Sequence, residues 1–330
     1  MTRLALVFPG QGSQAVGMGR PLAARSAAAA AVFAAADRAL GEPLSTLAWE
    51  GPEEALNRTE NAQPALLAAS IAYLEAVRER WAELAIEIPD PSFAAGHSMG
   101  QYSALVASGV IDVADGVRLV RERGRLMQAS GAGREGRMAA VIGLDDDRLP
   151  ELVRQAGERG IIGVANRNSP GQVVLSGERP AIEAALELAK ALGARRAIEL
   201  PVSVAAHSPL MAEAAEGMRA LLAEIPFRDP RIPLLANADG RRLDTADACR
   251  EELVAHLTTG VDWIATVERM RAEGVDIFVE VGPGRVLTGL IRRIAPDAVV
   301  LPLDDPGAAD RLAVPFADTA GSDVPTDLSA

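Results

Sequence analysis

Apolar positions along the chain form two recurring patterns, short continuous runs and stretches with a helical period. Continuous apolar runs indicate buried strands, and apolar residues that recur once per turn indicate helices. The clearest helical pattern lies between residues 61 and 84, where leucine, isoleucine and valine share one face. The strands predicted in the first and last thirds of the chain are 4–8, 93–96, 233–237, 276–281 and 299–303. The helices predicted there are 20–40, 53–57, 61–84, 112–128, 209–225, 249–257, 263–273 and 285–294.

The middle of the chain has a different order of elements. Strand, helix, two strands, helix and strand follow one another, and the two central strands meet at the turn signal Asn168-Ser169-Pro170-Gly171. This βαββαβ order is typical of a ferredoxin-like unit. We therefore expect a small domain at 134–202, inserted into a large α/β domain formed by 1–133 and 203–306. A composition rich in Pro, Gly, Ala, Ser and Asp predicts a flexible tail at 307–330.

Composition narrows the function classes. Hydrophobic residues make up 49% of the chain, yet the longest apolar runs are too short to cross a membrane. A net charge of −12 argues against broad binding to nucleic acid or to an anionic membrane. Cys249 is the only cysteine, which excludes an internal disulfide and a cysteine metal cluster. The chain begins with a strand pattern rather than a signal peptide, so a cytoplasmic protein is expected. The sequence does not specify an oligomeric state, and a monomer is the default expectation.

The segment Gly96-His97-Ser98-Met99-Gly100 carries the strongest chemical signal. It follows a short apolar run and precedes a helical pattern, which is the context of a nucleophile elbow. In such an elbow, glycines permit a sharp turn that exposes the serine hydroxyl, and the next backbone N–H can serve an oxyanion hole. The alternative is a glycine-rich turn with a solvated serine. The context favours covalent acyl chemistry at Ser98.

A serine nucleophile needs a general base, and the chain has three histidines. His97 adjoins Ser98 at the turn, where neighbouring side chains rarely point at each other, so it could shape the elbow instead. His256 lies in a helical pattern. His207 lies in a loop between a strand and a helix, where catalytic residues concentrate. We expect His207 to be the base, with His256 or a purely structural histidine as alternatives.

The orientation of this base remains open on the residues alone. A triad of the α/β-hydrolase type has an acid between the serine and the histidine in chain order. Most acids between Ser98 and His207 fall in the inserted block, and the nearest to His207 is Glu199. A dyad whose histidine is oriented by a backbone carbonyl therefore fits better than a triad.

Six separated motifs occur in order between Leu4 and Leu303. They are residues 8–14, 96–104, 121–128, 166–172, 202–207 and 280–284. Together they resemble motifs of the malonyl-CoA:acyl-carrier-protein transacylases, the acyltransferases of fatty-acid and polyketide synthesis. The resemblance implies an α/β-hydrolase-like domain with a ferredoxin-like insertion. It also implies malonyl-CoA as substrate, acyl carrier protein as partner, and no metal or redox cofactor.

The resemblance assigns roles to individual residues. It implies that Ser98 is the nucleophile, that His207 is the base, and that backbone N–H groups of Gln11 and Met99 form the oxyanion hole. The backbone carbonyl of His256 would orient His207, at a position where the family commonly has Gln. Gln101 stands where the family usually has Glu, and Met99 where it usually has Leu. The residues expected to contact substrate are Arg123, His97 and Asn168.

Two expectations depend on charge. By its position in the resemblance, Arg123 would hold the malonyl carboxylate, whereas the sequence alone favours an exposed helix arginine that pairs with Glu122 or another acid. Carrier proteins of this kind are acidic, so an enzyme of net charge −12 would dock one through a local basic patch. The candidate docking residues are Arg195, Arg196, Arg285, Arg292 and Arg293. An acyl hydrolase on the same scaffold and a non-enzymatic docking subunit remain alternative functions.

Overall fold

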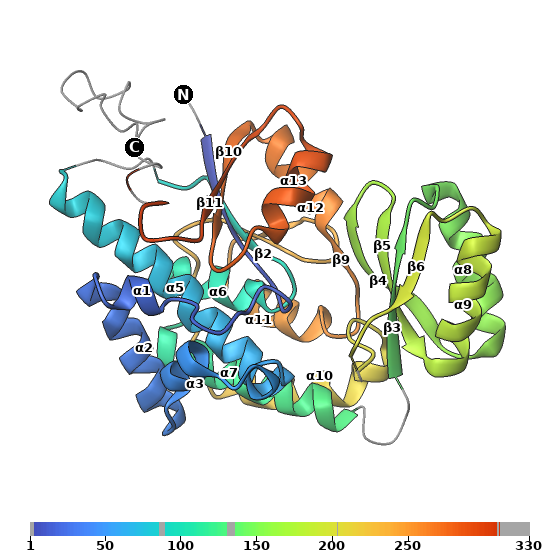
Figure 1. Cartoon of the computed structure of the whole chain (residues 1–330), viewed down its shortest axis with the longest axis horizontal. Coiled ribbons are helices and arrows are strands. Elements are labelled where there is room, and N and C mark those ends of the chain that lie inside the picture. Colours follow the sequence, from blue (N-terminus) through green and yellow to red (C-terminus); the bar gives the residue numbers. More distant parts are fainter. Residues whose placement is uncertain (1–2, 86–89, 131–135, 203, 309, 311–330) are drawn as a thin grey trace.

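The larger part of the protein is built on a six-stranded sheet covered on both faces by helices, as the computed structural model shows (Figure 1). The structure describes residues 3–85, 90–130, 136–202, 204–308 and 310. The strands, in the order in which they lie side by side, are β11 (Val299–Leu303), β10 (Val275–Val281), β1 (Arg3–Phe8), β2 (Phe93–Gly96), β7 (Leu234–Leu235) and β8 (Arg242–Leu243). The first five are parallel to their neighbours, and β8 is antiparallel to β7.

Strand β1 reads as one apolar run because both of its faces are buried. Leu4, Leu6 and Phe8 pack into the cluster on one side of the sheet, and Ala5 and Val7 pack into the cluster on the other side. Helices on both faces are typical of parallel sheets. The helices of this part are α1 (Arg20–Ala23), α2 (Ala27–Leu40), α3 (Leu44–Glu50), α4 (Glu53–Leu56), α5 (Thr59–Glu83), α6 (Gly100–Ala107), α7 (Val113–Ser130), α10 (Ala212–Ala223), α11 (Ala246–Ala255), α12 (Trp263–Ala272) and α13 (Val286–Ile294).

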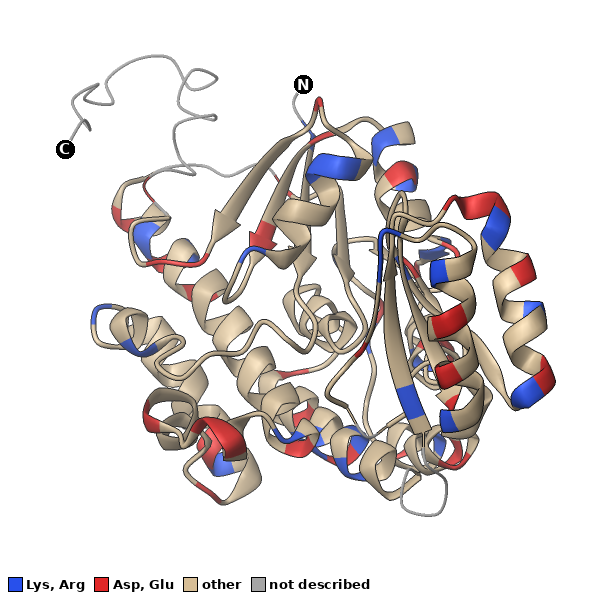
Figure 2. Cartoon of the chain, turned by 45° about the vertical axis from the view of Figure 1, so that its right-hand side comes forward, with Lys and Arg blue, Asp and Glu red and all other residues tan. Residues whose placement is uncertain are grey.

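The smaller part is built on a second sheet with helices on its outer face (Figure 1). Its strands lie in the order β6 (Arg196–Glu199), β3 (Gly136–Ile142), β5 (Gln172–Glu178), β4 (Ile162–Ser169) and β9 (Val261–Asp262). The first four are antiparallel, and β9 is parallel to β4. Helices α8 (Leu149–Ala156) and α9 (Arg179–Ala191) pack on this sheet, and their outer faces carry charges of both signs (Figure 2).

Most predicted elements are present, and the differences have local causes. The predicted helix 20–40 is two helices, because Ser26 caps α2 by accepting a hydrogen bond from the N–H of Ala29. Asn168 and Ser169 belong to β4, so the turn contains only Pro170 and Gly171. The sequence analysis missed α3, β8 and β9.

Helix α5 departs from the predicted amphipathic pattern because every residue from Ala62 to Leu74 is buried. It crosses the centre of the larger part, where no face meets solvent. The first residues of the predicted tail contact the larger part. Ala308 is 2% exposed, and Asp310 accepts a hydrogen bond from Arg80 of α5 at 2.9 Å, while residues 311–330 lie outside the described part.

The parallel strands bring several loops to one edge of the large sheet. β1, β2, β7 and β10 all run in the same direction, so the loops after Phe8, Gly96, Leu235 and Val281 meet at their carboxyl ends. Ligands of parallel α/β sheets bind at this edge. No helix within the described residues is long and apolar enough to span a membrane.

Candidate active site

Ser98 lies at a sharp turn between β2 and α6. Its backbone φ is 53°, a left-handed conformation that non-glycine residues rarely adopt. A Cβ at Gly96 would lie 1.9 Å from the carbonyl carbon of Gly100, and a Cβ at Gly100 would lie 2.2 Å from the carbonyl oxygen of Phe8. Only glycine fits at either position, so the two glycines are needed for the turn, as the sequence predicted.

The imidazole of His207 meets the Ser98 hydroxyl. Ser98 Oγ and His207 Nε2 are 2.7 Å apart, although the residues are far apart in sequence. The other ring nitrogen, Nδ1, lies 2.6 Å from the carbonyl oxygen of His256 and 3.2 Å from that of Thr259. Carbonyl oxygens only accept, so Nδ1 carries the proton and Nε2 is free to accept the Ser98 proton. No carboxylate takes part in these contacts.

Burial keeps this imidazole neutral. His207 is 5% exposed, and desolvation, with the nearby Arg123 guanidinium, lowers its pKa from 6.5 to about 3. A histidine with a pKa this low stays unprotonated at neutral and mildly acidic pH. It can therefore accept a proton wherever the fold is intact.

The low pKa of His207 predicts the pH dependence of Ser98 acylation. We expect the acylation rate to change less than about twofold between pH 8 and pH 5, because the base is neutral throughout and is lost only as pH approaches 3. Single-turnover acylation across this range measures it. An acid limb centred near 6.5, the ordinary value for histidine, would contradict this account of the base.

Arg123 brings a buried cation to the same hydroxyl. It lies on α7 and is 2% exposed. Its Nη1 donates to Gln63 Oε1 at 2.8 Å, and its Nη2 donates to Ser98 Oγ at 3.2 Å. Within the described residues no carboxylate pairs with it, and its Nε has no hydrogen-bond partner. Glu122 pairs with Arg125 instead, so the alternative of an exposed arginine paired with Glu122 is wrong.

This uncompensated cation indicates the kind of ligand that the site can accept. Burial lowers the pKa of the Arg123 guanidinium, but arginine stays charged in proteins. A buried charge without a partner is costly, and a ligand carboxylate would offset that cost through two parallel hydrogen bonds. The site is therefore suited to a ligand that carries a negative group close to the Ser98 hydroxyl.

The backbone N–H groups of Gln11 and Met99 are available for an oxyanion. Among the described residues, neither group donates a hydrogen bond to another protein atom. The first loop lies against the elbow, because a Cβ at Gly10 would be 2.7 Å from the carbonyl oxygen of His97. The side chain of Gln11 donates to Thr59 Oγ1 at 3.2 Å, which links the loop to α5.

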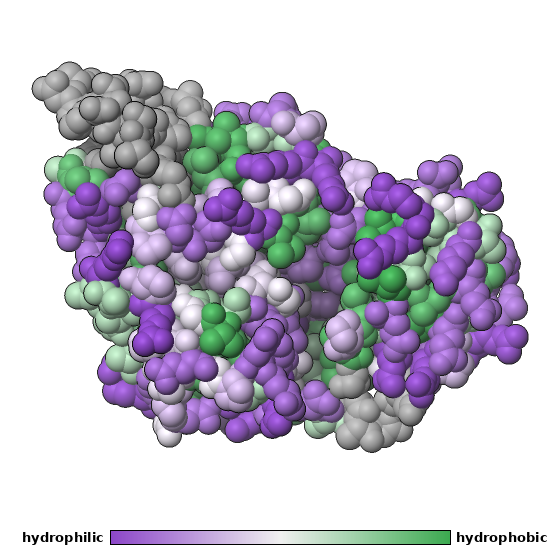
Figure 3. Space-filling model, viewed as in Figure 1, coloured by the Kyte–Doolittle hydropathy of each residue, from purple (hydrophilic) through white to green (hydrophobic). Residues whose placement is uncertain are grey.

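His97 and Asn168 connect the two sheets at the site. His97 Nε2 and Asn168 Oδ1 are 2.9 Å apart, and the His97 ring lies edge-on to Trp263 at 5.7 Å between centroids. His97 therefore does not point at Ser98. In the space-filling view the surface is hollowed between the part built on the large sheet and the part built on the small sheet (Figure 3).

His256 contributes its carbonyl group rather than its ring. The ring is fully buried, and neither ring nitrogen has a partner among the described residues. Its centroid lies 5.9 Å from that of His207, and no hydrogen bond joins it to Ser98. Desolvation lowers the pKa of His256 well below its ordinary value.

The five candidate docking arginines fall into two places. Ile142 of β3 pairs with Gln172 on one side and with Arg196 on the other, and Gln172 accepts a hydrogen bond from Arg293 at 2.8 Å. Arg195 packs against Gly143 at the same end of the small sheet. Arg292 adjoins Arg293 on α13. Arg285 differs, because it is paired with Asp304 at 2.6 Å.

Sequence reasoning missed two residues that hold the site. Gln63 on α5 orients Arg123, and Asn237 after β7 accepts a hydrogen bond from the N–H of Ser98 at 2.8 Å. A polar residue within or directly after an apolar run was the sequence signal for each, but it does not show which contacts the residue makes. No group of three or more His, Cys, Asp or Glu residues in the described part is arranged to hold a metal ion.

Comparison with known proteins identifies the family. The model of the acyl transferase domain matches residues 5–310. The chain belongs to the acyl transferase family. Among curated members, it is 45% identical to the malonyl CoA-acyl carrier protein transacylase of Escherichia coli (strain K12) over 308 residues, which cover 93% of this chain and 98% of that protein. The corresponding protein of Bacillus subtilis (strain 168) is 40% identical over 307 residues, which cover 93% and 95%.

Solved structures of family members share the fold. A Vibrio cholerae acyl carrier protein S-malonyltransferase matches with a TM-score of 0.89 and 42% identity, covering 94% of this chain and 100% of that one. A second acyl transferase, solved as a malonyl-transacylase in complex with a type II PKS acyl-carrier protein, matches with a TM-score of 0.89 and 41% identity, covering 95% and 100%. The mixed α/β fold expected from the sequence is confirmed.

Proposed function

We propose that the protein transfers a malonyl group from malonyl-CoA to the phosphopantetheine thiol of an acyl carrier protein. The observation that carries this proposal is the convergence of His207 and the Arg123 guanidinium at the Ser98 hydroxyl, with no carboxylate paired to Arg123 among the described residues. A serine with a neutral histidine supports acyl transfer, and the buried cation supports an acyl group with a free carboxylate. The names of the relatives agree with both.

The reaction proceeds in two halves. Nε2 of His207 takes the Ser98 proton while Oγ attacks the thioester carbonyl, and the resulting oxyanion accepts hydrogen bonds from the backbone N–H groups of Gln11 and Met99. The tetrahedral intermediate collapses, and His207 returns the proton to the departing CoA thiolate. The carrier-protein thiol then attacks the malonyl-serine ester by the same route in reverse. The carbonyl of His256 keeps the ring in the required tautomer throughout.

Arg123 determines which acyl group is accepted. Its guanidinium would pair with the malonyl carboxylate through two hydrogen bonds, and His97 and Asn168 would line the same space at the junction of the sheets. Charge-assisted bonds contribute roughly 1.5–3 kcal/mol each, so the pair is worth about 10²- to 10⁴-fold in rate. An acetyl group has no carboxylate to pair with the cation.

Arg123→Ala is expected to lower kcat/KM for malonyl-CoA by about 10²- to 10⁴-fold. The ratio of kcat/KM for malonyl-CoA to kcat/KM for acetyl-CoA should fall by a similar factor. Parallel kinetics with both CoA esters measure this. Arg125→Ala is the matched control, because Arg125 lies on the same helix but is half exposed and pairs with Glu122. An unchanged ratio of malonyl to acetyl transfer in Arg123→Ala would remove the residue from the site.

We propose two domains, one built on each sheet. We assign 1–133 and 203–306 to a large α/β-hydrolase-like domain and 134–202 to a ferredoxin-like small domain. The mostly parallel sheet with an elbow after β2 supports the first assignment. The order β6-β3-β5-β4, with antiparallel neighbours and two helices on one face, supports the second.

An acidic carrier protein would dock at the end of the small sheet next to α13. Arg195, Arg196, Arg292 and Arg293 are all exposed there, whereas Arg285 is neutralised by Asp304 and becomes the weakest candidate. Opposite charges across an interface chiefly raise the rate of association.

Reversing the charge of both Arg195 and Arg196 to Glu is expected to raise the KM for the carrier protein about tenfold and to leave the KM for malonyl-CoA unchanged. The same reversal at Arg78, on helix α5 of the larger part, is the control and should change neither constant. A change in the KM for malonyl-CoA alone, with no change in the KM for the carrier protein, would reject this docking site.

The transferase is distinguished from the alternative acyl hydrolase by the fate of the malonyl group. The enzyme is incubated with malonyl-CoA and carrier protein, and the carrier is weighed by mass spectrometry. We expect malonylated carrier. Free malonate without loaded carrier would favour the hydrolase instead.

A further inference from the structure

Asn237 lies two residues after β7, and the oxygen and nitrogen of its buried side-chain amide both make hydrogen bonds at the elbow. It is 3% exposed. Its Oδ1 accepts a hydrogen bond from the backbone N–H of Ser98 at 2.8 Å, and its Nδ2 donates to the carbonyl oxygen of Gly96 at 3.0 Å and to Gln101 Oε1 at 3.1 Å. Asn237 therefore holds the backbone on both sides of His97 and reaches the helix after the turn.

The surrounding donors and acceptors fix the orientation of this amide. Ser98 N–H can only donate and the Gly96 carbonyl can only accept, so the oxygen and nitrogen of Asn237 cannot be exchanged. Gln101 is fixed in the same way, since its Nε2 donates to the carbonyl of Leu235 at 3.0 Å and its Oε1 accepts from Gly96 N–H at 3.2 Å. A flip of either amide alone would break three hydrogen bonds.

The contact lies at a residue whose backbone conformation is strained. The left-handed conformation of Ser98 persists only if its surroundings impose it, and such a conformation costs roughly 1–3 kcal/mol. The hydrogen bond from Ser98 N–H to Asn237 is a direct restraint on that conformation. Loss of the restraint would let the hydroxyl move away from His207 Nε2.

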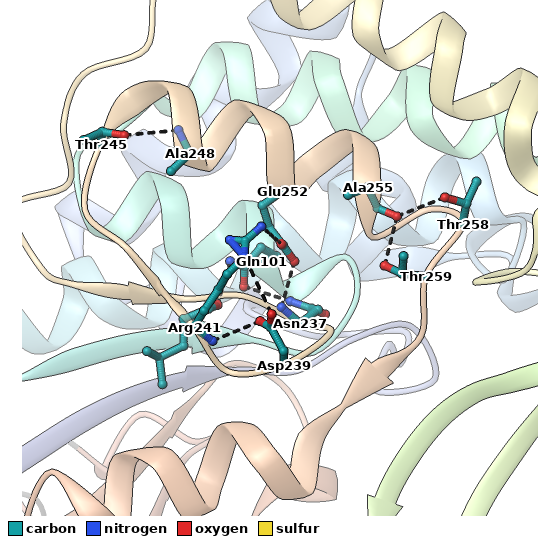
Figure 4. A network of polar contacts seen from close by, with 11 residues as sticks. Gln101, Asn237, Asp239, Arg241, Thr245, Ala248, Glu252, Ala255, Thr258 and Thr259 are labelled. Carbon is teal, nitrogen blue, oxygen red and sulfur yellow. Dashed lines mark hydrogen bonds and ion pairs between the residues drawn. The ribbon is translucent and has the colours of Figure 1, made fainter.

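Helix α11 connects Asn237 to the base. The backbone N–H of Asn237 donates to Glu252 Oε1 at 2.7 Å, and Glu252 Oε2 accepts from Arg241 at 3.3 Å (Figure 4). One turn after Glu252 comes His256, the residue that directly follows the helix, and its backbone carbonyl accepts a hydrogen bond from His207 Nδ1. The same helix thus holds the amide that restrains Ser98 and the carbonyl that orients His207.

We propose that Asn237 is a positioning residue, which holds the Ser98 backbone in the geometry for attack and sets it relative to His207 through Glu252 and α11. This inference rests on the proposed role of Ser98 as nucleophile. It does not depend on which acyl group is transferred.

Two substitutions test the proposal. Asn237→Ala removes the restraint, and we expect kcat for malonyl transfer to fall about 10- to 100-fold with KM for malonyl-CoA within about twofold of wild type, since a small misplacement of a reacting atom has effects of this size. Labelling of Ser98 by a fluorophosphonate should slow by a similar factor. Asn237→Ser replaces this variant if it fails to fold, and the same outcome is expected.

Asn237→Asp gives a signature that a merely structural residue would not give. At neutral pH its second carboxylate oxygen would face the Gly96 carbonyl and Gln101 Oε1, and Glu252, Asp239 and Arg241 are the charged groups packed around it. A protonated carboxyl group can donate to the Gly96 carbonyl as the amide does. We therefore expect the rate at which a fluorophosphonate labels Ser98 of this variant to rise at least threefold from pH 8 to pH 5. The rate for the wild-type protein should stay constant over this range.

Asn61→Ala is the matched control, because the half-buried side-chain amide of Asn61 donates to the carbonyl of Ala55 at 2.8 Å outside the site. It should alter the melting temperature without altering the labelling rate. Two results would overturn the proposal. One is a labelling rate of folded Asn237→Ala within twofold of the wild-type rate, and the other is a labelling rate of Asn237→Asp that does not rise at low pH. A wild-type enzyme that is labelled but transfers no malonyl group would reject the proposed function and leave this test intact.

Discussion

Ser98→Ala is expected to reduce malonyl transfer by about 10⁵-fold or more and to abolish the acyl-enzyme. Removal of a serine nucleophile from a serine–histidine site has an effect of this order, because no other group can form the covalent intermediate. The rate is measured with malonyl-CoA and holo carrier protein, and the intermediate is detected by intact mass. The oxyanion donors remain, so residual activity above that in water is expected.

The matched control for this variant is Ser103→Ala. Ser103 lies on α6 just after the elbow and is fully buried, but its hydroxyl has no hydrogen-bond partner among the described residues. We expect its replacement to leave the transfer rate within about twofold. Full activity of Ser98→Ala would contradict the assignment of the nucleophile.

His207→Ala is expected to lower kcat by about 10⁴-fold or more, because Ser98 then has no acceptor for its proton. The double variant Ser98→Ala/His207→Ala should lose little beyond Ser98→Ala alone, since the two side chains act as one unit. Steady-state kinetics of the three variants measure this coupling. Additive losses in the double variant would show that the two residues act independently.

His256→Gln separates the two candidate bases. The substitution keeps the backbone carbonyl that accepts a hydrogen bond from His207 Nδ1. It removes the imidazole ring of His256, which makes no hydrogen bond among the described residues. We expect kcat within about threefold of wild type. A loss as large as that of His207→Ala would favour the alternative in which His256 is the base.

The elbow was predictable from sequence because its requirements are local. The spacing of Gly96, Ser98 and Gly100 after an apolar run specifies a turn that only glycines can flank, and the structure shows the steric reason in the contacts that a Cβ would make. The five parallel strands of the large sheet were predictable for a similar reason, because the sheet is buried on both faces and its strands are largely apolar runs.

Other features of the site depend on contacts that the sequence does not display. Arg123 reads as an ordinary surface residue of an amphipathic helix, and its burial arises from the packing of α7 against α5, where Gln63 receives it. Asn237 is a single polar residue after a short strand. Its partners Gly96 and Ser98 lie far away in the chain, so only the pairing of β7 with β2 brings them together.

The short elements were missed for a related reason. Strands β8 and β9 contain two residues each, too few to show a period, and they form only because a neighbouring strand offers its edge. The long helix α5 is a different case. Its sequence predicts a helix, but the burial of Ala62 to Leu74 on every side depends on the elements that pack around it.

Peptide mapping of the acyl-enzyme tests the central claim most directly. The wild-type protein is mixed with malonyl-CoA, quenched, digested and analysed by mass spectrometry, and a second sample receives holo carrier protein before the quench. The account predicts one malonyl group on Ser98 in the first sample and its transfer to the carrier in the second. A malonyl group on another residue, or one on Ser98 that the carrier cannot remove, would contradict it.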